Sequence, residues 1–175
     1  MNRTTRLRLH IVALLAATLL VISGCAAGGT TAEDRRRLAQ LKEDPVLSPV
    51  EQVATLVRST DEAGQRTANV QQHPNRVIRW YEANGSNPRE VSVKVASLAS
   101  DAGWSGQLNC QSRGASIFAS KAIEDWTAHL QIEFSPKGDG TTVALEISTP
   151  HVDSGATQPQ QTPSGGVQVQ ASCTS

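Results

Sequence analysis

Histidine most often moves protons near neutral pH, so the histidines are the first candidates for chemistry in this chain. His129 falls on the polar face of an alternating segment, His73 lies in a polar stretch, and His151 follows Pro150. No Cys-x-x-Cys motif and no histidine-rich spacing accompanies them. We therefore expect solvated surface histidines, no metal and no cofactor.

Nucleophiles and paired carboxylates would support other chemistries. The chain has no Gly-x-Ser-x-Gly motif, which would present a nucleophilic serine on a sharp turn. Cys110 could act as a nucleophile with His129 as its base. The acid pairs Asp61-Glu62 and Glu124-Asp125 would suit glycoside cleavage only across a sugar-sized cleft, with carboxyls about 5–10 Å apart. Adjacent acids are first of all turn formers, so the sequence predicts a protein that is not an enzyme.

The N-terminus carries a sharper signal for covalent chemistry. Three arginines precede an apolar run from Ile11 to Ile22, which is the pattern of a signal peptide. The run is shorter than the roughly 20 apolar residues of a membrane-spanning helix. It ends in Ile22-Ser23-Gly24-Cys25, which resembles the lipobox of bacterial prolipoproteins. The resemblance implies cleavage between Gly24 and Cys25, and transfer of a diacylglyceryl group to the Cys25 thiol.

This motif sets expectations about location and partners. Removal of residues 1–24 leaves 151 residues with 13 basic and 16 acidic side chains, a net charge of −3. Such a chain is a poor binder of nucleic acid. We expect a lipoprotein on the extracytoplasmic face of the cell membrane, held by membrane lipid through the acylated Cys25. The sequence leaves the oligomeric state open.

Two further cysteines, Cys110 and Cys173, stand 63 positions apart. An even pair in an exported chain is expected to form a disulfide. The chain-entropy model values a loop of this length at about 4 kcal/mol. Two free thiols, a metal site or a link between two molecules are the alternatives that the sequence leaves open.

The segment 88–102 carries the strongest helix signals. Asn87 can cap the helix, Pro88 suits the first helical position, and Glu90 lies in the first turn. Apolar residues recur at helical spacing. Gly103 follows at the position after the helix, where a left-handed backbone conformation commonly ends a helix. The sequence therefore predicts one main helix with a single apolar stripe.

Alternation with a period of two predicts strands that bury one face. It is clearest at 126–134, where the outward residues form a candidate partner face of Thr127, His129, Gln131 and Glu133. Further strands are predicted at 77–81, 108–110, 115–123 and 143–147, the last after a hairpin connection at 136–140.

Two segments have no clear pattern of this kind. Residues 48–64 combine the spacing of a capping box with an alternation of β-branched residues, so helix and strand both stay open. Residues 64–76 are polar and predict a loop.

These elements predict an α+β fold in two layers, with one main helix at about 88–102 packed on a four- to five-stranded antiparallel sheet. All six aromatic residues lie between Trp80 and Phe134, which places the core at about 76–149. The expected organisation is a signal peptide at 1–24, a flexible tether with a short basic helix at 25–44, a domain at 45–152, and a low-complexity tail at 153–175 that Cys173 holds.

The layout resembles small lipoproteins of high-GC Gram-positive bacteria, which combine a lipobox, a short linker and a strand–helix–strand–strand–strand domain. Their helix often ends in Ala-Gly-Trp, here Ala102-Gly103-Trp104, and 12 arginines against 4 lysines suit such a genome. The resemblance implies a fold and a location but no assigned chemistry. It also favours a strand at 51–60.

Two functional hypotheses follow. The first is a tethered, non-catalytic module that docks an envelope protein through the candidate partner face. The second is a small-ligand carrier or an envelope enzyme. A lipid carrier needs a large apolar cavity, for which so small a core has little room. An enzyme needs His129 or His151 beside an acid and a nucleophile. We favour the first hypothesis.

Overall fold

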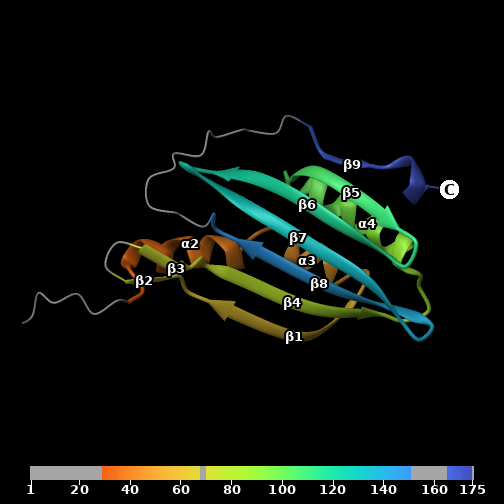
Figure 1. Cartoon of the computed structure of the whole chain (residues 1–175), viewed down its shortest axis with the longest axis horizontal. Coiled ribbons are helices and arrows are strands. Elements are labelled where there is room, and N and C mark those ends of the chain that lie inside the picture. The colour runs from red at the N-terminus through yellow and green to blue at the C-terminus, as the bar shows by residue number, and fades with distance from the viewer. Residues whose placement is uncertain (1–28, 68–69, 151–164, 175) are drawn as a thin grey trace, which may run out of the picture.

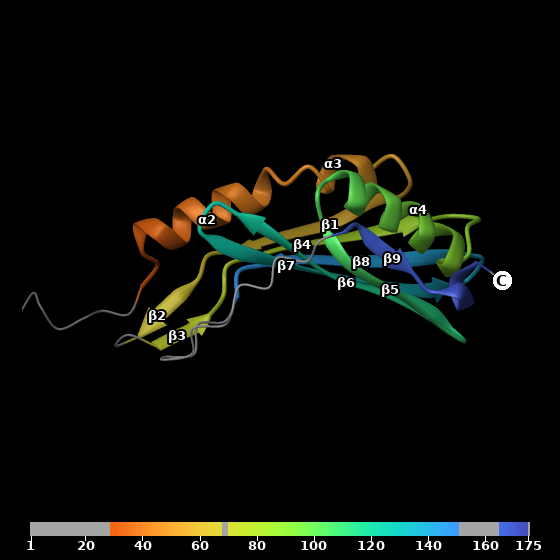
Figure 2. The ribbon, with the colours of Figure 1, turned by 90° about the horizontal axis from the view of Figure 1, so that it is seen from above.

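A computed structural model describes residues 29–67, 70–150 and 165–174 of the chain. Within these residues one seven-stranded sheet carries three α-helices on one of its faces, which is an α+β arrangement (Figures 1 and 2). The strand order is β1-β4-β8-β7-β6-β5-β9. Neighbouring strands are antiparallel except β9, which runs parallel to β5.

The elements follow one another along the chain as labelled in Figure 1. The helices are α2 (Ala32–Lys42), α3 (Leu47–Val50) and α4 (Pro88–Asp101), with a short 3-10 helix η1 (Ala171–Cys173) at the end. The strands of the main sheet are β1 (Thr55–Glu62), β4 (Arg76–Ala83), β5 (Ser105–Gln111), β6 (Gly114–Ile123), β7 (Trp126–Lys137), β8 (Gly140–Ser148) and β9 (Val167–Val169). A separate pair, β2 (Gln65–Thr67) and β3 (Val70–His73), lies between β1 and β4 in the chain.

Helix α4 begins and ends where the sequence places it. The Asn87 side chain accepts hydrogen bonds from the backbone N–H groups of Arg89 and Glu90, at 3.0 and 3.1 Å. Pro88 occupies the first turn, where its missing N–H costs nothing. Gly103 has φ +85°, a left-handed conformation that glycine adopts without steric penalty.

The core lies between the helices and one face of the sheet (Figure 2). Alternate residues of β4, β6, β7 and β8 point into it and are buried: Val77, Tyr81, Ile117, Leu130, Ile132, Phe134, Val143, Leu145 and Ile147. Helix α4 contributes Val91, Val95 and Ala99 to the same layer. Burial of this apolar surface is the main force that holds the two layers together.

The sheet has more strands than the four to five that we expected. The additional strands are at its edges, where β1 comes from the ambiguous segment 48–64 and β9 from the low-complexity tail. Strand β9 has three residues, and of these Val167 alone is buried. Composition predicts such edge strands poorly, because backbone pairing with a neighbour supplies most of their stabilisation.

The ambiguous segment contains both structures in succession. The turn of α3 buries Leu47 and Val50, and the chain then extends into β1. The expected loop at 64–76 is not a loop throughout, because β2 pairs with β3 there. A short antiparallel pair requires backbone hydrogen bonds rather than an apolar face, so a polar sequence does not prevent it.

The tether expected at 25–44 differs from the structure in its second half. Helix α2 packs on the domain, where Leu41 is fully buried and Asp34 is 1% exposed. Its first turn is closed by a reciprocal capping box, in which Thr31 Oγ1 accepts from the Asp34 N–H and an Asp34 oxygen accepts from the Thr31 N–H. The folded part therefore begins well before residue 45.

The C-terminal end of the described chain is attached covalently. The expected disulfide joins Cys110 of β5 to Cys173 of η1, with their Cα atoms 5.3 Å apart. The backbone N–H of Val167 also donates to Ser100 Oγ of α4 at 2.7 Å. These contacts place β9 beside β5 at the edge of the sheet opposite β1 (Figure 1).

Candidate interaction surface

Figure 2 shows that the helices lie on one side of the sheet and that no described element covers the other side. We call this other side the outer face. Its residues include Arg58, Thr60, Ile78, Trp80, Ser116, Phe118, His129, Gln131, Glu133, Ala144 and Glu146.

The candidate partner face of β7 lies on the outer face. Its members alternate with the buried core residues of β7, so that His129, Gln131 and Glu133 are exposed and Thr127 is partly exposed. The Gln131 side-chain amide donates to Glu133 Oε1 at 3.0 Å. This bond fixes two neighbouring polar groups in the middle of the sheet.

Strand register extends this patch into rows that cross the sheet. One row contains Thr60, Ile78, Glu146, Gln131 and Phe118, each directly opposite the next. A paired residue points to the same face as its partner, so these side chains lie side by side across five strands. The outer face is thus polar and acidic in its centre, with an apolar group toward each side.

Two aromatic residues stand on the outer face, Trp80 on β4 and Phe118 on β6. Phe118 is 50% exposed, and Trp80 is partly buried. Three interstrand steps separate their strands, about 14 Å in all. Phe118 falls within the range 76–149 that was predicted to hold the core, but its side chain points away from the core. Its place between Ser116 and Ser120 in an alternating strand is the signal that could have identified it.

The side chain of Trp80 is covered by a cation. The Arg58 guanidinium lies 4.8 Å from the centre of the indole ring, a cation–π contact. These two residues line an open hollow of about 250 Å³ together with Val57, Tyr81, Glu82, Lys137 and Thr142. Lys137 Nζ pairs with the Glu82 carboxylate at 2.5 Å, and both residues belong to the lining of the hollow.

The titratable groups of the outer face do not form a catalytic constellation among the described residues. Partial desolvation by its neighbours lowers the pKa of His129 below its ordinary value, which favours the neutral imidazole. Its neighbours across the strands are Ser148 and Ser120, and no described carboxylate hydrogen-bonds to it. His73 is exposed on β3, and His151 lies outside the described residues.

The other chemical candidates have structural roles. Cys110 is held in the disulfide and so lacks the free thiol that a nucleophile requires. Of the acid pair on β1, Glu62 accepts from Arg76, and Asp61 accepts from Arg79 at 2.7 Å. In the second pair, Glu124 lies at the β6–β7 turn with φ +52° and pairs with α2.

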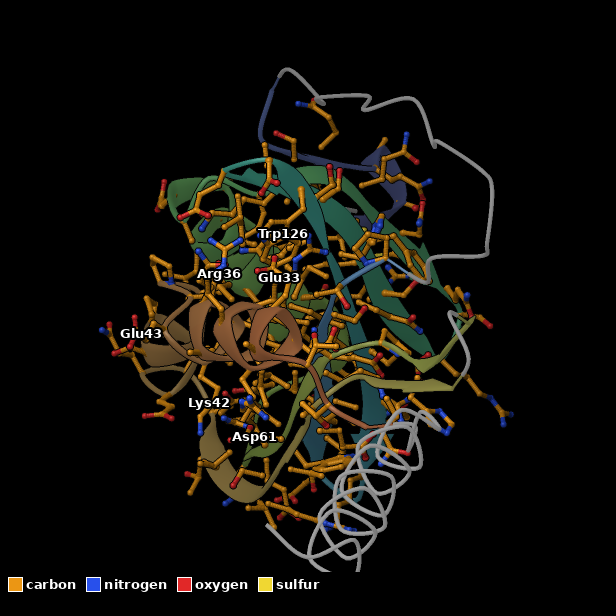
Figure 3. The ribbon with its side chains drawn as sticks, turned by 90° about the vertical axis from the view of Figure 1, so that its left-hand side faces the viewer. Glu33, Arg36, Lys42, Glu43, Asp61 and Trp126 are labelled. Atoms are coloured by element: carbon orange, nitrogen blue, oxygen red, sulfur yellow. A yellow bond between two sulfur atoms is a disulfide. The ribbon has the colours of Figure 1, made fainter. Side chains whose placement is uncertain are left out.

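Ion pairs attach helix α2 to the sheet on both of its flanks, as Figure 3 shows. On one flank, Arg36 bridges Glu33 of α2 and Glu124 of the β6–β7 turn. Hydrogen bonds from Arg36 and then Arg37 lower the pKa of the Glu33 carboxyl to about 2. The guanidinium of Arg37 also lies 5.4 Å from the Trp126 ring centre.

On the other flank, Lys42 of α2 pairs with Asp61 of β1 at 3.0 Å (Figure 3). Partial burial raises the pKa of Asp61, but hydrogen bonds from Arg79 and Lys42 outweigh this effect. The net pKa of Asp61 therefore lies below its ordinary value. Both flanks are held by groups that must stay charged.

A buried carboxylate holds the junction between α2 and α3. Asp44 is 5% exposed and accepts hydrogen bonds from the Trp104 indole N–H at 3.0 Å and from Lys121 Nζ at 2.9 Å. The backbone N–H of Val46 donates to the same carboxylate at 2.9 Å. Lys121 also lies over the Trp104 ring. This set is satisfied internally and belongs to the core rather than to a binding site.

The predicted lipidation and cleavage residues, Cys25 and Gly24, lie outside the described residues. Within the part of the chain that the structure describes, no helix has the length and apolar character needed to cross a membrane. The same residues contain no group of three His, Cys, Asp or Glu side chains arranged to hold a metal ion.

No protein-family model, curated protein or solved structure matches this chain. The resemblance to small lipoproteins therefore remains an expectation that comes from the lipobox and the order of elements.

Proposed function

We propose that the protein is a membrane-anchored lipoprotein of the cell envelope that acts without catalysis, as an interaction module. Its outer face would dock an envelope protein. The observation that carries this proposal is the outer face, which no described element covers and which presents Trp80 and Phe118 among polar and acidic side chains. Partly exposed aromatic residues surrounded by polar groups are typical centres of protein–protein interfaces.

The charge of the outer face indicates the kind of partner. Glu133 and Glu146 project from its central strands, and neither forms an ion pair with a described residue. Their mutual repulsion favours a partner that brings basic side chains to the middle of the sheet. Trp80 and Phe118 would fill apolar recesses of that partner on either side.

The membrane anchor is tested separately from the docking surface. In cells that express the protein and are grown with labelled palmitate, we expect label in the natural chain and none in Cys25→Ala. We also expect natural chain in the membrane fraction and its release in the variant. Label that persists in Cys25→Ala, or an unlabelled natural chain, would contradict the anchor.

Docking is tested by site-specific photo-cross-linking in living cells. A benzophenone amino acid replaces Gln131 on the outer face, and in a matched control it replaces Ser97, which is exposed on α4. We expect one recurrent protein of the envelope to be captured from position 131 and not from position 97. Equal capture from both positions, or from neither, would refute docking on this face.

The residues responsible are identified in the position 131 background. Trp80→Ala and Phe118→Ala should each reduce capture at least tenfold, because aromatic residues that are buried by a partner carry much of the energy of an interface. His129→Ala with Glu133→Ala tests the patch that the sequence predicts. Lys94→Ala, on the exposed side of α4, is the control that should change nothing.

A further inference from the structure

Strand β1 forms one edge of the main sheet and is eight residues long. Every second residue of an edge strand points its backbone N–H and C=O away from the sheet, where no strand completes them. Its exposed residues include apolar ones, since Leu56 is 40% and Val57 is 59% exposed. The strand at the opposite edge, β9, has only three residues, and the disulfide between Cys110 and Cys173 lies next to it in the chain.

The pairing of β1 with β4 is irregular between Leu56 and Arg58, and it is regular from Arg58 to Glu62. In this regular part Arg58, Thr60 and Glu62 point to the outer face, because they stand opposite Trp80, Ile78 and Arg76. The strand thus presents a cation, a hydroxyl and a carboxylate at equal steps along its outer side.

Both charged groups have capacity for a further partner. Arg58 stacks on Trp80, and no described carboxylate pairs with it. Both hydrogen bonds that Glu62 accepts from Arg76 reach the same oxygen, Oε2. The second carboxylate oxygen of Glu62 is therefore left for another donor.

We propose that β1 pairs with β1 of a second copy of this chain, antiparallel and centred on Thr60, to form one continuous sheet. In a symmetric antiparallel pair, the residue n positions before the central residue of one strand stands opposite the residue n positions after the central residue of the other strand. Arg58 then stands opposite Glu62 of the second copy, and Glu62 stands opposite its Arg58. Two cross-strand ion pairs form from one symmetric contact.

The neighbouring registers lack this complementarity. A pair centred on residue 58 sets Arg58 against Arg58, and one centred on residue 61 sets Asp61 against Asp61. A pair centred on residue 59 brings Arg58 opposite Thr60 and forms no ion pair. Like charges directly opposite one another destabilise a strand pair. Charge therefore selects the register centred on Thr60.

The contact is tested by cysteine cross-linking of the full chain in the membranes of cells that express it. Thr60→Cys places two thiols directly opposite each other, at a separation that suits a disulfide. We expect a dimer band on a non-reducing gel for Thr60→Cys. We expect none for the natural chain, and at least tenfold less for Ser59→Cys, whose thiol would face Asp61 of the second copy.

The charges are tested in the Thr60→Cys background. Arg58→Glu alone sets acids against acids, and Glu62→Arg alone sets bases against bases, so each should reduce the dimer band at least tenfold. Co-expression of these two variants with different tags should restore a mixed dimer, because every facing pair is then of opposite charge. This restoration also excludes misfolding as the reason for the loss.

Three results would overturn the proposal. The first is no dimer band for Thr60→Cys, or a band of the size of a different protein, which would identify β1 as the docking strand of a foreign partner. The second is an equally strong band for Ser59→Cys. The third is a mixed dimer no more abundant than the dimers of the single variants.

Discussion

The two ends of the described chain are both docked on the sheet, and they are docked by different chemistry. At the N-terminal end, α2 is held by Asp44, which directly follows the helix, and by ion pairs on both flanks. At the C-terminal end, η1 is held by a disulfide and β9 by a short parallel pairing. Acid and salt should therefore loosen the first end, whereas a reductant should loosen the second.

The difference shows how segments of different composition can both be attached to the same sheet. The segment 32–44 is rich in charged residues and can satisfy a network of ion pairs. The segment 165–174 has no charged residue and little apolar surface, so a covalent bond replaces contacts that its side chains cannot make.

The largest expected effect comes from the buried acid of the N-terminal attachment. Asp44→Ala leaves the Trp104 indole N–H and the Lys121 ammonium without their shared partner. Loss of one partner of a buried pair costs about 3–5 kcal/mol of unfolding free energy. Urea denaturation followed by Trp fluorescence measures it. Asp44→Asn keeps an acceptor for the indole and should cost less, and equal losses would show that charge is unimportant there.

Removal of the disulfide should have an effect of similar or slightly smaller size. Cys110→Ser with Cys173→Ser releases a loop of 63 residues' separation, which the chain-entropy model values at about 4 kcal/mol. Amide exchange should then rise in β9 and η1 while α2 stays protected. Exchange that rises equally in α2 would show that the two attachments are not independent.

Acid should act selectively on α2. The pKa of Glu33 is about 2 in the folded chain and lies near 4.5 for a free carboxyl. Its contribution is therefore complete above about pH 4.5 and is lost as the pH falls toward 2. Glu33→Gln should flatten the dependence of the melting temperature on pH in this window. Glu43→Gln, an exposed acid outside the described ion pairs, should leave that dependence as in the natural chain.

The smallest expected effect belongs to an exposed ion pair of the same helix. Arg36→Gln removes the bridge between Glu33 and Glu124, whose side chains are 40% and 55% exposed. Exposed pairs contribute about 0–1 kcal/mol, and roughly 1 M salt screens them. The stability difference from the natural chain should vanish in that salt. A difference that persists would indicate lost packing of the arginine stem.

The elements that the sequence predicted well are those in which local and tertiary signals agree. Helix α4 has an N-terminal cap, one apolar face and a glycine after its end, and β7 alternates apolar and polar residues without a break from 126 to 133. The sequence predicts a short basic helix where α2 lies, but it places that helix in a flexible tether rather than on the domain. Its position depends on acids and bases that lie far away in the sequence, as Arg36 and Glu124 do, and these cannot be paired from spacing alone.

The residues of the outer face could likewise be predicted from the sequence only in part. The alternation of β7 predicted which of its residues point outward, including His129 and Glu133. Trp80 and Phe118 could not be assigned to a face with the same ease, since an aromatic residue in a strand is usually buried. Which strands lie beside each other decides that both belong to one surface, and strand order is not encoded in any single segment.

The short stretch of chain between Cys25 and α2 has a consequence for the anchored and paired molecule that we propose. Two anchors that enter the same leaflet require the two-fold axis of the pair to stand along the membrane normal. The axis of a β1–β1 pair is perpendicular to the sheet, so the joined sheet would lie parallel to the bilayer. Cys25 and Ala32 are seven residues apart, a span of about 25 Å at most. A β1–β1 pair that is anchored in this way would therefore lie within about 25 Å of the lipid surface over its whole breadth.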